Sequence, residues 1–425
     1  MMKTHKTDTP QGKIKEMKER AILHSDANCF YASVEMVLNP SLRNKAVAVC
    51  GSEEERHGIV LAKSEKAKKA GITTGMPNWK ARELCKDLII VTPHFEYYSK
   101  FSRLLHEIYY RYTDFVEPFG LDECWLDVTS SLKSPMQIAN EIRQAVKDEL
   151  GLTVSIGVSY NKVLAKLGSD LKKPDAITEI TKENFKERVW NLPCGDLLYC
   201  GRSTAEALAS IGVKTIGELA ELKQEYMVAK FGKNGLELWN YANGIDNSPV
   251  AHKDEIVPPK SIGHGITCVE NIKSMDEARA VIYTLCQDIG HRLRAEGVRA
   301  KGVSLGVKDK DLSYASYRKK LEIATQDEAN IAKVACEILA ERHDPRREIR
   351  ALTVTAINLE DSNEIEQIDM FFDYGSVERK KRLNKALDSI KSEYGREAIV
   401  PAVILNESKI PKKKQGKVLP GKMKK

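Results

Sequence analysis

The sequence has no apolar run long enough to cross a membrane, and its first twenty residues are polar and rich in lysine. Those residues have no apolar core of the kind that a secretory signal needs, so we expect a cytoplasmic protein without a membrane partner. The nine cysteines include no C-x-x-C pair, and their number is odd. This pattern predicts free thiols in a reducing compartment and argues against a zinc site or a disulfide framework.

Most of the chain also has no excess of positive over negative charge. The formal net charge is +7 over 425 residues, but residues 406–425 alone hold eight lysines and one glutamate. This Lys-rich tail accounts for the whole excess, so a basic surface for nucleic acid has to be found locally. With 42% hydrophobic and 30% charged residues, the composition suits a globular protein. A chain of this length should divide into roughly three or four domains.

Acidic side chains occur at residues 117–129, where a folding chain would normally place apolar surface. Residues 121–128 alternate with the period of a strand, and Pro118 with Gly120 predicts a tight turn before it. Carboxylates such as Asp122 and Glu123 beside large apolar side chains are costly unless a cation meets them. Mg²⁺ suits this position because it takes carboxylate oxygens and leaves room for phosphate. The alternative is a solvated acidic turn on a surface hairpin.

A second acid, Asp26, stands at the end of a short strand that begins at Ala21. Phe30 and Tyr31 follow it at the start of a helical pattern. Asp26 could instead cap this helix, and the two aromatic residues could belong to a core. Strands interleaved with helices, with acids at strand ends, predict an α+β sheet domain whose active edge collects Asp26 and the two hairpin acids.

Two helices carry lysines that could bind phosphate. Residues 63–70 predict a basic helix that includes Lys63 and Lys68, although a solvated lysine face is the alternative. Residues 162–173 predict a helix that is stopped by Pro174 and presents Lys173 in its last turn.

The second half of the chain changes character at residue 181. Residues 181–247 predict short helices only, and residues 198–219 resemble a helix-hairpin-helix, a motif that aims backbone N–H groups at DNA phosphates. The usual hairpin has a glycine where Tyr199 stands. Residues 248–259 predict a linker, and residues 260–360 predict a split β-α-β arrangement. Its strands carry basic residues, namely Arg299, Lys301, Lys308, Arg318, Lys319 and Lys320.

Read together, these stretches resemble the Y-family of lesion-bypass DNA polymerases, of the polymerase IV and V kind. The resemblance covers residues 21–400 and is carried by three blocks in order, at residues 26–35, 120–127 and 157–174. It implies a multidomain right hand. Its parts would be a disordered leader (1–20), a palm (21–28 and 92–180), small fingers (29–91), a helical thumb with the helix-hairpin-helix (181–247), a linker (248–259), a β-α-β-β-α-β little finger (260–360) and a C-terminal region (361–425).

The resemblance also implies roles for single residues. Two Mg²⁺ ions would be held by Asp26, Asp122, Glu123 and the carbonyl of Ala27. Tyr31 would be the steric gate against ribonucleotides, beside Phe30 in the nucleotide site. Lys173 would contact the triphosphate. Relatives often have Tyr and Arg on the fingers helix, where this chain has Glu65 and Lys68, so Lys68 would have to carry that duty. Asn28 stands where some relatives have a third Asp and is not expected to bind metal. The implied clamp-binding peptide contains Gln367, Met370 and Phe371.

The implied activity is template-directed DNA synthesis from primer-template DNA and deoxynucleoside triphosphates. Nothing in the sequence resembles a proofreading exonuclease, so we expect low fidelity. The resemblance also implies translesion synthesis and binding of the sliding clamp, and we expect a monomer. Two alternatives stay open. One is a palm-type nucleotide cyclase with the same metal-binding acids, and the other is a non-catalytic DNA-binding accessory protein of the same fold.

Overall fold

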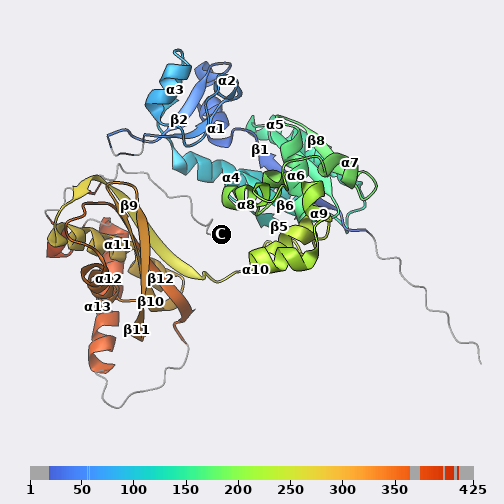
Figure 1. The fold of residues 1–425 in the computed structure, drawn as a ribbon. Helices are drawn as coiled ribbons and strands as arrows, with labels where there is room; N and C mark the ends of the chain where they lie inside the picture. Colours follow the sequence, from blue (N-terminus) through green and yellow to red (C-terminus); the bar gives the residue numbers. More distant parts are fainter. Residues whose placement is uncertain are drawn as a thin grey trace, which may run out of the picture.

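Three β-sheets organise the chain in this computed structural model, which describes residues 19–54, 56, 58–363, 374–395, 398–405 and 409–410. The central sheet has the strand order β5-β6-β1-β7-β8, the small sheet β3-β2-β4, and the terminal sheet β11-β10-β12-β9. Helices pack against each sheet, and the fold is of the mixed α+β class (Figure 1). No helix in the described ranges is long and apolar enough to span a bilayer.

The central sheet is built from antiparallel partners on both sides of β1, with β8 added in parallel to β7. A Cβ at Gly157 would lie 1.8 Å from the carbonyl oxygen of Ala165, so only glycine lets α6 approach β7 this closely. The strands are β1 (Ile22–Ala27), β5 (Val116–Pro118), β6 (Glu123–Asp127), β7 (Val154–Ser159) and β8 (Ile177–Ile180). The helices are α1 (Phe30–Leu38), α4 (Phe95–Tyr109), α5 (Pro135–Leu150) and α6 (Lys162–Leu171).

Strand alternation gives β1 two different faces. Leu23 and Ala27 belong to the core under α4 and α5, whereas Ile22 packs with Ala165 of α6. Asp26 has the same parity as Ile22 and therefore points to the α6 side of the sheet. The acid is thus buried on the α6 side of the sheet, where Lys166 contacts it.

The small sheet differs from the sequence prediction at one helix. Lys63 pairs with Ala48 at the end of β3, and Ser64 caps the helix that follows, so the helix begins at Glu65 instead of Lys63. The elements of this unit are β2 (Val47–Cys50), β3 (Val60–Lys63), β4 (Ile89–Val91), α2 (Glu65–Lys69), α3 (Asn78–Leu84) and the 3₁₀ turn η1 (Pro40–Leu42).

A helical unit follows β8, as the sequence predicts. Its core includes residues of α6, so it packs directly on the central-sheet unit. Thr215 and Glu218 form a reciprocal capping box at the start of α9. The helices are α7 (Phe185–Val189), α8 (Arg202–Ala209), α9 (Ile216–Ala220) and α10 (Gln224–Ala242), with the 3₁₀ turn η2 (Cys194–Asp196) between α7 and α8.

The first half of the predicted linker is docked. Val250 is buried against Ile22 and Trp125, and the backbone N–H of Ala251 donates to Glu117. Lys253 binds Asp114 through both its backbone and its side chain. Apolar burial and two acids therefore hold residues 250–253 on the central-sheet unit, which leaves residues 254–259 as the exposed connection.

The terminal sheet has helices on one face only, and its element order is the predicted strand, helix, two strands, helix, strand. Figure 1 shows most of it apart from the other units, and Arg56 of the small-sheet unit donates a hydrogen bond to Asn271 of β9 at 2.7 Å. The C-terminal helix α13 (Tyr374–Tyr394) is fixed to this unit by a two-bond contact between Arg294 and Asp388. The elements are β9 (Ser261–Ile272), α11 (Met275–Ala295), β10 (Val298–Asp309), β11 (Tyr314–Thr325), α12 (Glu328–Arg342), β12 (Ile349–Asp361) and the 3₁₀ turn η3 (Ala402–Ile404).

Candidate active site and nucleic-acid face

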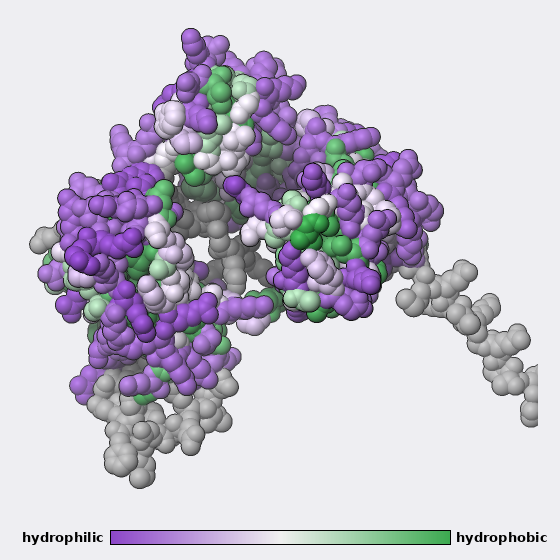
Figure 2. Space-filling model, viewed as in Figure 1, coloured by the Kyte–Doolittle hydropathy of each residue, from purple (hydrophilic) through white to green (hydrophobic). Residues whose placement is uncertain are grey.

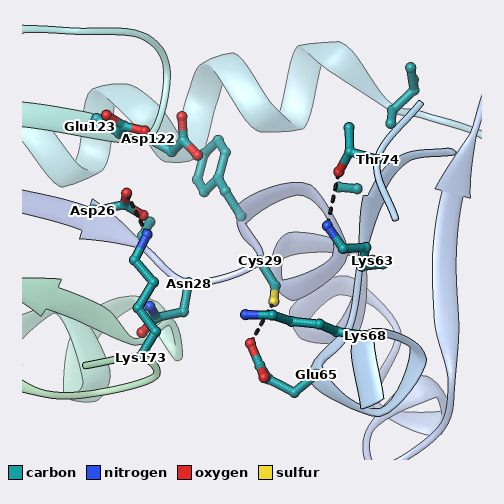
Figure 3. Close-up of a pocket in the computed structure, with 14 residues that line it drawn as sticks. Asp26, Asn28, Cys29, Lys63, Glu65, Lys68, Thr74, Asp122, Glu123 and Lys173 are labelled. Atoms are coloured by element: carbon teal, nitrogen blue, oxygen red, sulfur yellow. Dashed lines mark hydrogen bonds and ion pairs between the residues drawn. The ribbon is translucent and has the colours of Figure 1, made fainter. Parts of the chain in front are cut away.

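The three predicted metal-binding acids lie together at one end of the central sheet. In the register of β1 and β6, Asp26 stands opposite Glu123, and the N–H of Ala27 donates to the carbonyl of Asp122 at 2.9 Å. All four residues line one pocket (Figure 3). The structure therefore brings residues from two distant segments into a single site.

The simpler interpretations of these acids are wrong. Helix α1 has Cys29 as its N-cap, without a side-chain cap, so Asp26 caps no helix. Asp26 is only 6% exposed, and Asp122 and Glu123 are half-buried. A solvated acidic turn would expose its carboxylates, whereas these face one another and nearby lysines.

Crowding among the carboxylates sets their protonation. Burial, followed by the charges of Asp26 and Glu123, raises the pKa of Asp122 to about 6. Burial acts to raise the pKa of Glu123 too, but His24 and Lys166 outweigh it and lower that pKa to about 2. The Asp122 carboxylate is thus destabilised by burial and by repulsion from Asp26 and Glu123, and a bound cation would offset this repulsion.

Two lysines, Lys166 and Lys173, neutralise the other two acids, Asp26 and Glu123. Lys166 lies 2.9 Å from Glu123 and 3.3 Å from Asp26, and Lys173 lies 2.8 Å from Asp26. Burial alone would lower the pKa of Lys166, but the carboxylates of Glu123, Asp170 and Asp26 more than offset it and raise that pKa. Both lysines are therefore charged. Lys166 belongs to α6, but the helix ends at Leu171 and Lys172 is extended. The prediction that Lys173 stands in the last turn of this helix is therefore wrong, and Lys173 reaches Asp26 from just beyond the helix.

Sequence reasoning missed three residues of this site: His24, Lys166 and Asp170. His24 is fully buried, with Nδ1 2.9 Å from Ser169 and Nε2 3.5 Å from Glu123. Asp170 binds both lysines. Lys166 and Asp170 stand at i and i+4 in α6, a spacing that predicts one shared helix face, and this signal could have revealed two of the three.

The acids fit divalent cations by the chemistry of their oxygen atoms, which are the hard ligands that Mg²⁺ prefers. In the described part of the chain, no three Asp, Glu, His or Cys side chains already stand in metal-ligating positions. The ammonium groups of Lys166 and Lys173 contact one oxygen of Asp26, and that of Lys166 also contacts one oxygen of Glu123. A divalent cation at these acids would therefore compete with the two lysines for the negative charge of the carboxylates.

The opposite wall of the pocket comes from the small sheet and carries Lys63 and Lys68 (Figure 3). Lys63 donates to Thr74 at 3.0 Å, while Lys68 extends into the pocket toward the acids. Glu65 accepts a hydrogen bond from the Cys29 thiol. Burial, together with Glu65, raises the pKa of Cys29 to about 12, so this thiol is protonated and unreactive at neutral pH.

The two aromatic residues at the start of α1 are held differently. Phe30 is buried and lines the pocket. Tyr31 stacks on Tyr98 with ring centroids 4.1 Å apart and contacts Phe95 edge-on. Burial, followed by the charge of Asp122, raises the pKa of Tyr31. Tyr31 is therefore a half-exposed ring held rigidly by two neighbours.

Asn28 turns away from the acids. Its Nδ2 donates to Ser155 and its Oδ1 accepts from the backbone N–H of Asp175, both at 2.9 Å. Both polar ends of the amide are thus used to join β1 to β7 and to the segment after α6. This agrees with the expectation that Asn28 binds no metal.

Comparison with known proteins decides the family. The sequence model of the impB/mucB/samB family matches residues 25–170, and that of its C-terminal domain matches residues 259–370. A DNA polymerase IV from Acetivibrio thermocellus is 44% identical over 392 residues, which cover 92% of this chain and 98% of the relative. A DNA polymerase IV from Clostridium acetobutylicum is 36% identical over 397 residues, which cover 91% and 99%. The solved structure of a Y-family DNA polymerase chimera has a TM-score of 0.71 at 25% identity and covers 80% of this chain and 98% of that one. The chain belongs to the Y-family of DNA polymerases.

The terminal sheet of this Y-family polymerase sorts its basic residues onto two faces. Lys319 binds Glu337 and Glu341 of α12 and so lies on the helix side. Arg318 and Lys320, its neighbours in β11, project from the open face. In register, Arg318 pairs with Ser304 and Lys320 pairs with Gly302 of β10. The rows of this face continue across β12 to β9 and consist mostly of small residues, with the larger Ile357 in the row of Lys320; the small residues are Gly263, Gly265, Gly302, Ser304, Gly306, Thr353 and Thr355. The open face is thus lined mainly by small residues and is basic at one edge.

Other basic residues of this sheet are neutralised within the unit. Arg299 and Lys301 both pair with Glu360, and Arg347 pairs with Asp309. Figure 2 shows an opening between the terminal-sheet unit and the rest of the molecule, with hydrophilic side chains along much of its rim.

The hairpin before α8 keeps a glycine-like backbone although its residue is tyrosine. Tyr199 has φ 65°, in the left-handed region that glycine adopts without steric cost, and its side chain is 64% exposed. The turn is closed by a bond from the Cys200 N–H to the carbonyl of Leu197. The turn before α8 therefore has a left-handed residue at Tyr199.

The peptide that resembles a clamp-binding motif, with Gln367, Met370 and Phe371, lies outside the described residues, as does the tail from residue 411. Its two neighbours in the chain, β12 and α13, both belong to the terminal-sheet unit. Within the Lys-rich tail, the described residue Lys409 binds Glu270.

Proposed function

We infer that the chain is a template-directed DNA polymerase that adds deoxynucleotides to a primer 3′ end and copies past damaged bases with low fidelity and without proofreading. The observation that carries this inference is the meeting of Asp26, Asp122 and Glu123 opposite a lysine-bearing wall. The central-sheet unit would serve as palm, the small-sheet unit as fingers, the helical unit as thumb and the terminal-sheet unit as little finger.

In this proposal Asp26, Asp122, Glu123 and the carbonyl of Ala27 hold two Mg²⁺ ions. When bound, the two metals activate the primer hydroxyl and stabilise the charge of the leaving pyrophosphate. Lys68 and Lys173 face the pocket from opposite walls, which supports their assignment to the triphosphate. Phe30 would pack against the nucleotide, and Tyr31 would lie against its sugar.

The open face of the terminal sheet is the proposed DNA grip, together with the hairpin before α8. Small residues let a phosphate backbone approach the sheet closely, and basic side chains at its edge supply charge without reading base sequence. A polymerase that copies any template needs contacts of this kind.

Replacing both Arg318 and Lys320 with alanine should weaken DNA binding. It should also lower the slope of log K against log salt concentration by about 2, because the loss of two phosphate contacts reduces the number of counterions that binding releases. Lys319→Ala is the matched control. It removes a lysine between the same two residues, but one that binds Glu337 and Glu341 on the other face. Fluorescence anisotropy over a series of salt concentrations measures both. Equal slopes for the double variant and the wild type would remove the open face from the DNA interface.

Clamp binding is proposed at Gln367, Met370 and Phe371, for a polymerase that works as a monomer in the cytoplasm. Phe371→Ala should abolish the increase in product length that a sliding clamp gives, because an aromatic anchor in a partner pocket carries much of such an interface. Activity without the clamp should stay unchanged. A variant that still responds fully to the clamp would place the contact elsewhere.

Primer extension by the full chain tests the proposed function. Extension of a primed template by single deoxynucleotides, including past an abasic site, is the expected result. Formation of a cyclic nucleotide without extension would favour the cyclase, and DNA binding without either product would favour the accessory protein.

A further inference from the structure

Asp170 is a fourth carboxylate beside the three catalytic acids, and it holds both lysines of the site. Its Oδ2 lies 3.2 Å from Lys166 Nζ, and its Oδ1 lies 2.8 Å from Lys173 Nζ. Each oxygen thus binds one ammonium group. Asp170 is more exposed than the catalytic acids, with a side chain 44% accessible, so it stands at the rim of the site.

The same two lysines also occupy the catalytic carboxylates. Lys166 contacts Glu123 Oε2 and Asp26 Oδ2, and Lys173 contacts Asp26 Oδ2. Each lysine therefore bridges a catalytic acid and Asp170. A divalent cation that binds Asp26 and Glu123 would compete with these ammonium groups for the negative charge of the same two carboxylates.

We propose that Asp170 is a positioning residue that takes over Lys166 and Lys173 when the catalytic acids bind their cations. This inference rests on the proposed function, because it assigns the cations to Asp26, Asp122 and Glu123. Both lysines already touch Asp170, so each can give up its catalytic partner while keeping an ion pair. Neither lysine then becomes an unpaired buried charge, which would raise the free energy of the folded protein.

Without the Asp170 carboxylate, the lysines would have only the catalytic acids as partners. Cation binding would then have to leave Lys166, whose side chain is 14% accessible, without a carboxylate. Asp170→Asn should therefore lower the affinity for Mn²⁺ about tenfold, although Asp170 itself is no proposed ligand. Electron paramagnetic resonance of free Mn²⁺, titrated with the full chain without DNA, measures this affinity independently of catalysis.

Asp175→Asn is the matched control. Asp175 also binds two basic residues, Arg143 and Lys147, and lies five positions further along the same segment, but it contacts neither lysine of the site. This variant should bind Mn²⁺ like the wild type. Equal melting temperatures of the two variants would show that the fold is intact.

A double-mutant cycle distinguishes the proposed transfer of the lysines to Asp170 from a simple effect of net charge on Mn²⁺ binding. Lys166→Met removes the competing ammonium group. It should raise Mn²⁺ affinity about twofold in the wild type, where Lys166 can move to Asp170, but about tenfold in Asp170→Asn, where it cannot. Equal factors in both backgrounds would mean simple charge addition and would overturn the proposal. So would an Asp170→Asn protein that binds Mn²⁺ as tightly as the wild type.

Primer extension by the same preparations distinguishes this failure from failure of the proposed function. A wild type that extends primers and binds Mn²⁺, with no effect of Asp170→Asn, overturns the role of Asp170 alone. A wild type that neither extends primers nor binds Mn²⁺ overturns both.

Discussion

Replacement of Asp122 with alanine should lower kcat for primer extension at least about 10³-fold, which corresponds to about 4 kcal/mol of lost transition-state stabilisation. Asp122 carries the repulsion of Asp26 and Glu123 and faces them at one corner of the pocket. Removing it should relieve that repulsion and stabilise the metal-free protein, while the proposed metal site loses a ligand. Single-turnover extension measures the rate, and thermal unfolding without divalent cations measures the stability.

Asp127→Asn provides the control for this experiment. Asp127 lies at the other end of the same strand, opposite Ile22, and accepts a hydrogen bond from the backbone of Thr129. Its replacement should leave kcat within about twofold of the wild type, because surface-like changes away from a site have small effects. Full activity of Asp122→Ala would show that the metal site is misplaced. A DNA affinity that fell in parallel with kcat would point to misfolding instead.

Tyr31→Ala should admit ribonucleotides, with discrimination against them lowered roughly 10²-fold or more, since removal of a steric clash removes the repulsive part of specificity. The ring of Tyr31 is fixed by stacking on Tyr98 and by the edge of Phe95, so it cannot swing aside to make room for a 2′-hydroxyl. Incorporation of deoxynucleotides should change little. Ratios of kcat/KM for matched ribo- and deoxynucleotides give the measurement.

Tyr31→Phe separates the ring from its hydroxyl group. It keeps the ring that stacks on Tyr98 and should keep the discrimination. If Tyr31→Phe admits ribonucleotides as freely as Tyr31→Ala, a hydrogen bond of the phenol and not its bulk selects the sugar. Unchanged selection in Tyr31→Ala would remove Tyr31 from the gate.

The alternation of side chains along the strands predicted that the acids of the site share one face of the sheet. The parity of β1 and β6 places Asp26 and Glu123 on the side of α6, together with Ile22 and Trp125. The order of strands and helices in residues 260–360 was equally readable, since each element carries its own period. Boundaries shifted by a few residues where pairing overrode propensity, as at Lys63, which joins β3.

What the sequence left undetermined depends on contacts between distant segments. No local signal shows that Lys166 and Lys173 fold back onto Asp26, or that His24 lies beside Glu123. The split of basic residues on β11 between an open and a helix-covered face also needed the partners of Lys319. Docking of residues 250–253 was hidden because its partners, Asp114 and Glu117, are far away in the chain.

Anomalous diffraction from crystals of the full chain with Mn²⁺, primer-template DNA and an unreactive deoxynucleotide analogue tests the central claim most directly. Two anomalous peaks should appear between Asp26, Asp122 and Glu123, on the side of the nucleotide phosphates, with both lysines moved off the catalytic oxygens. A bound nucleotide without any peak at these three acids, or with peaks held by other residues, would contradict the account.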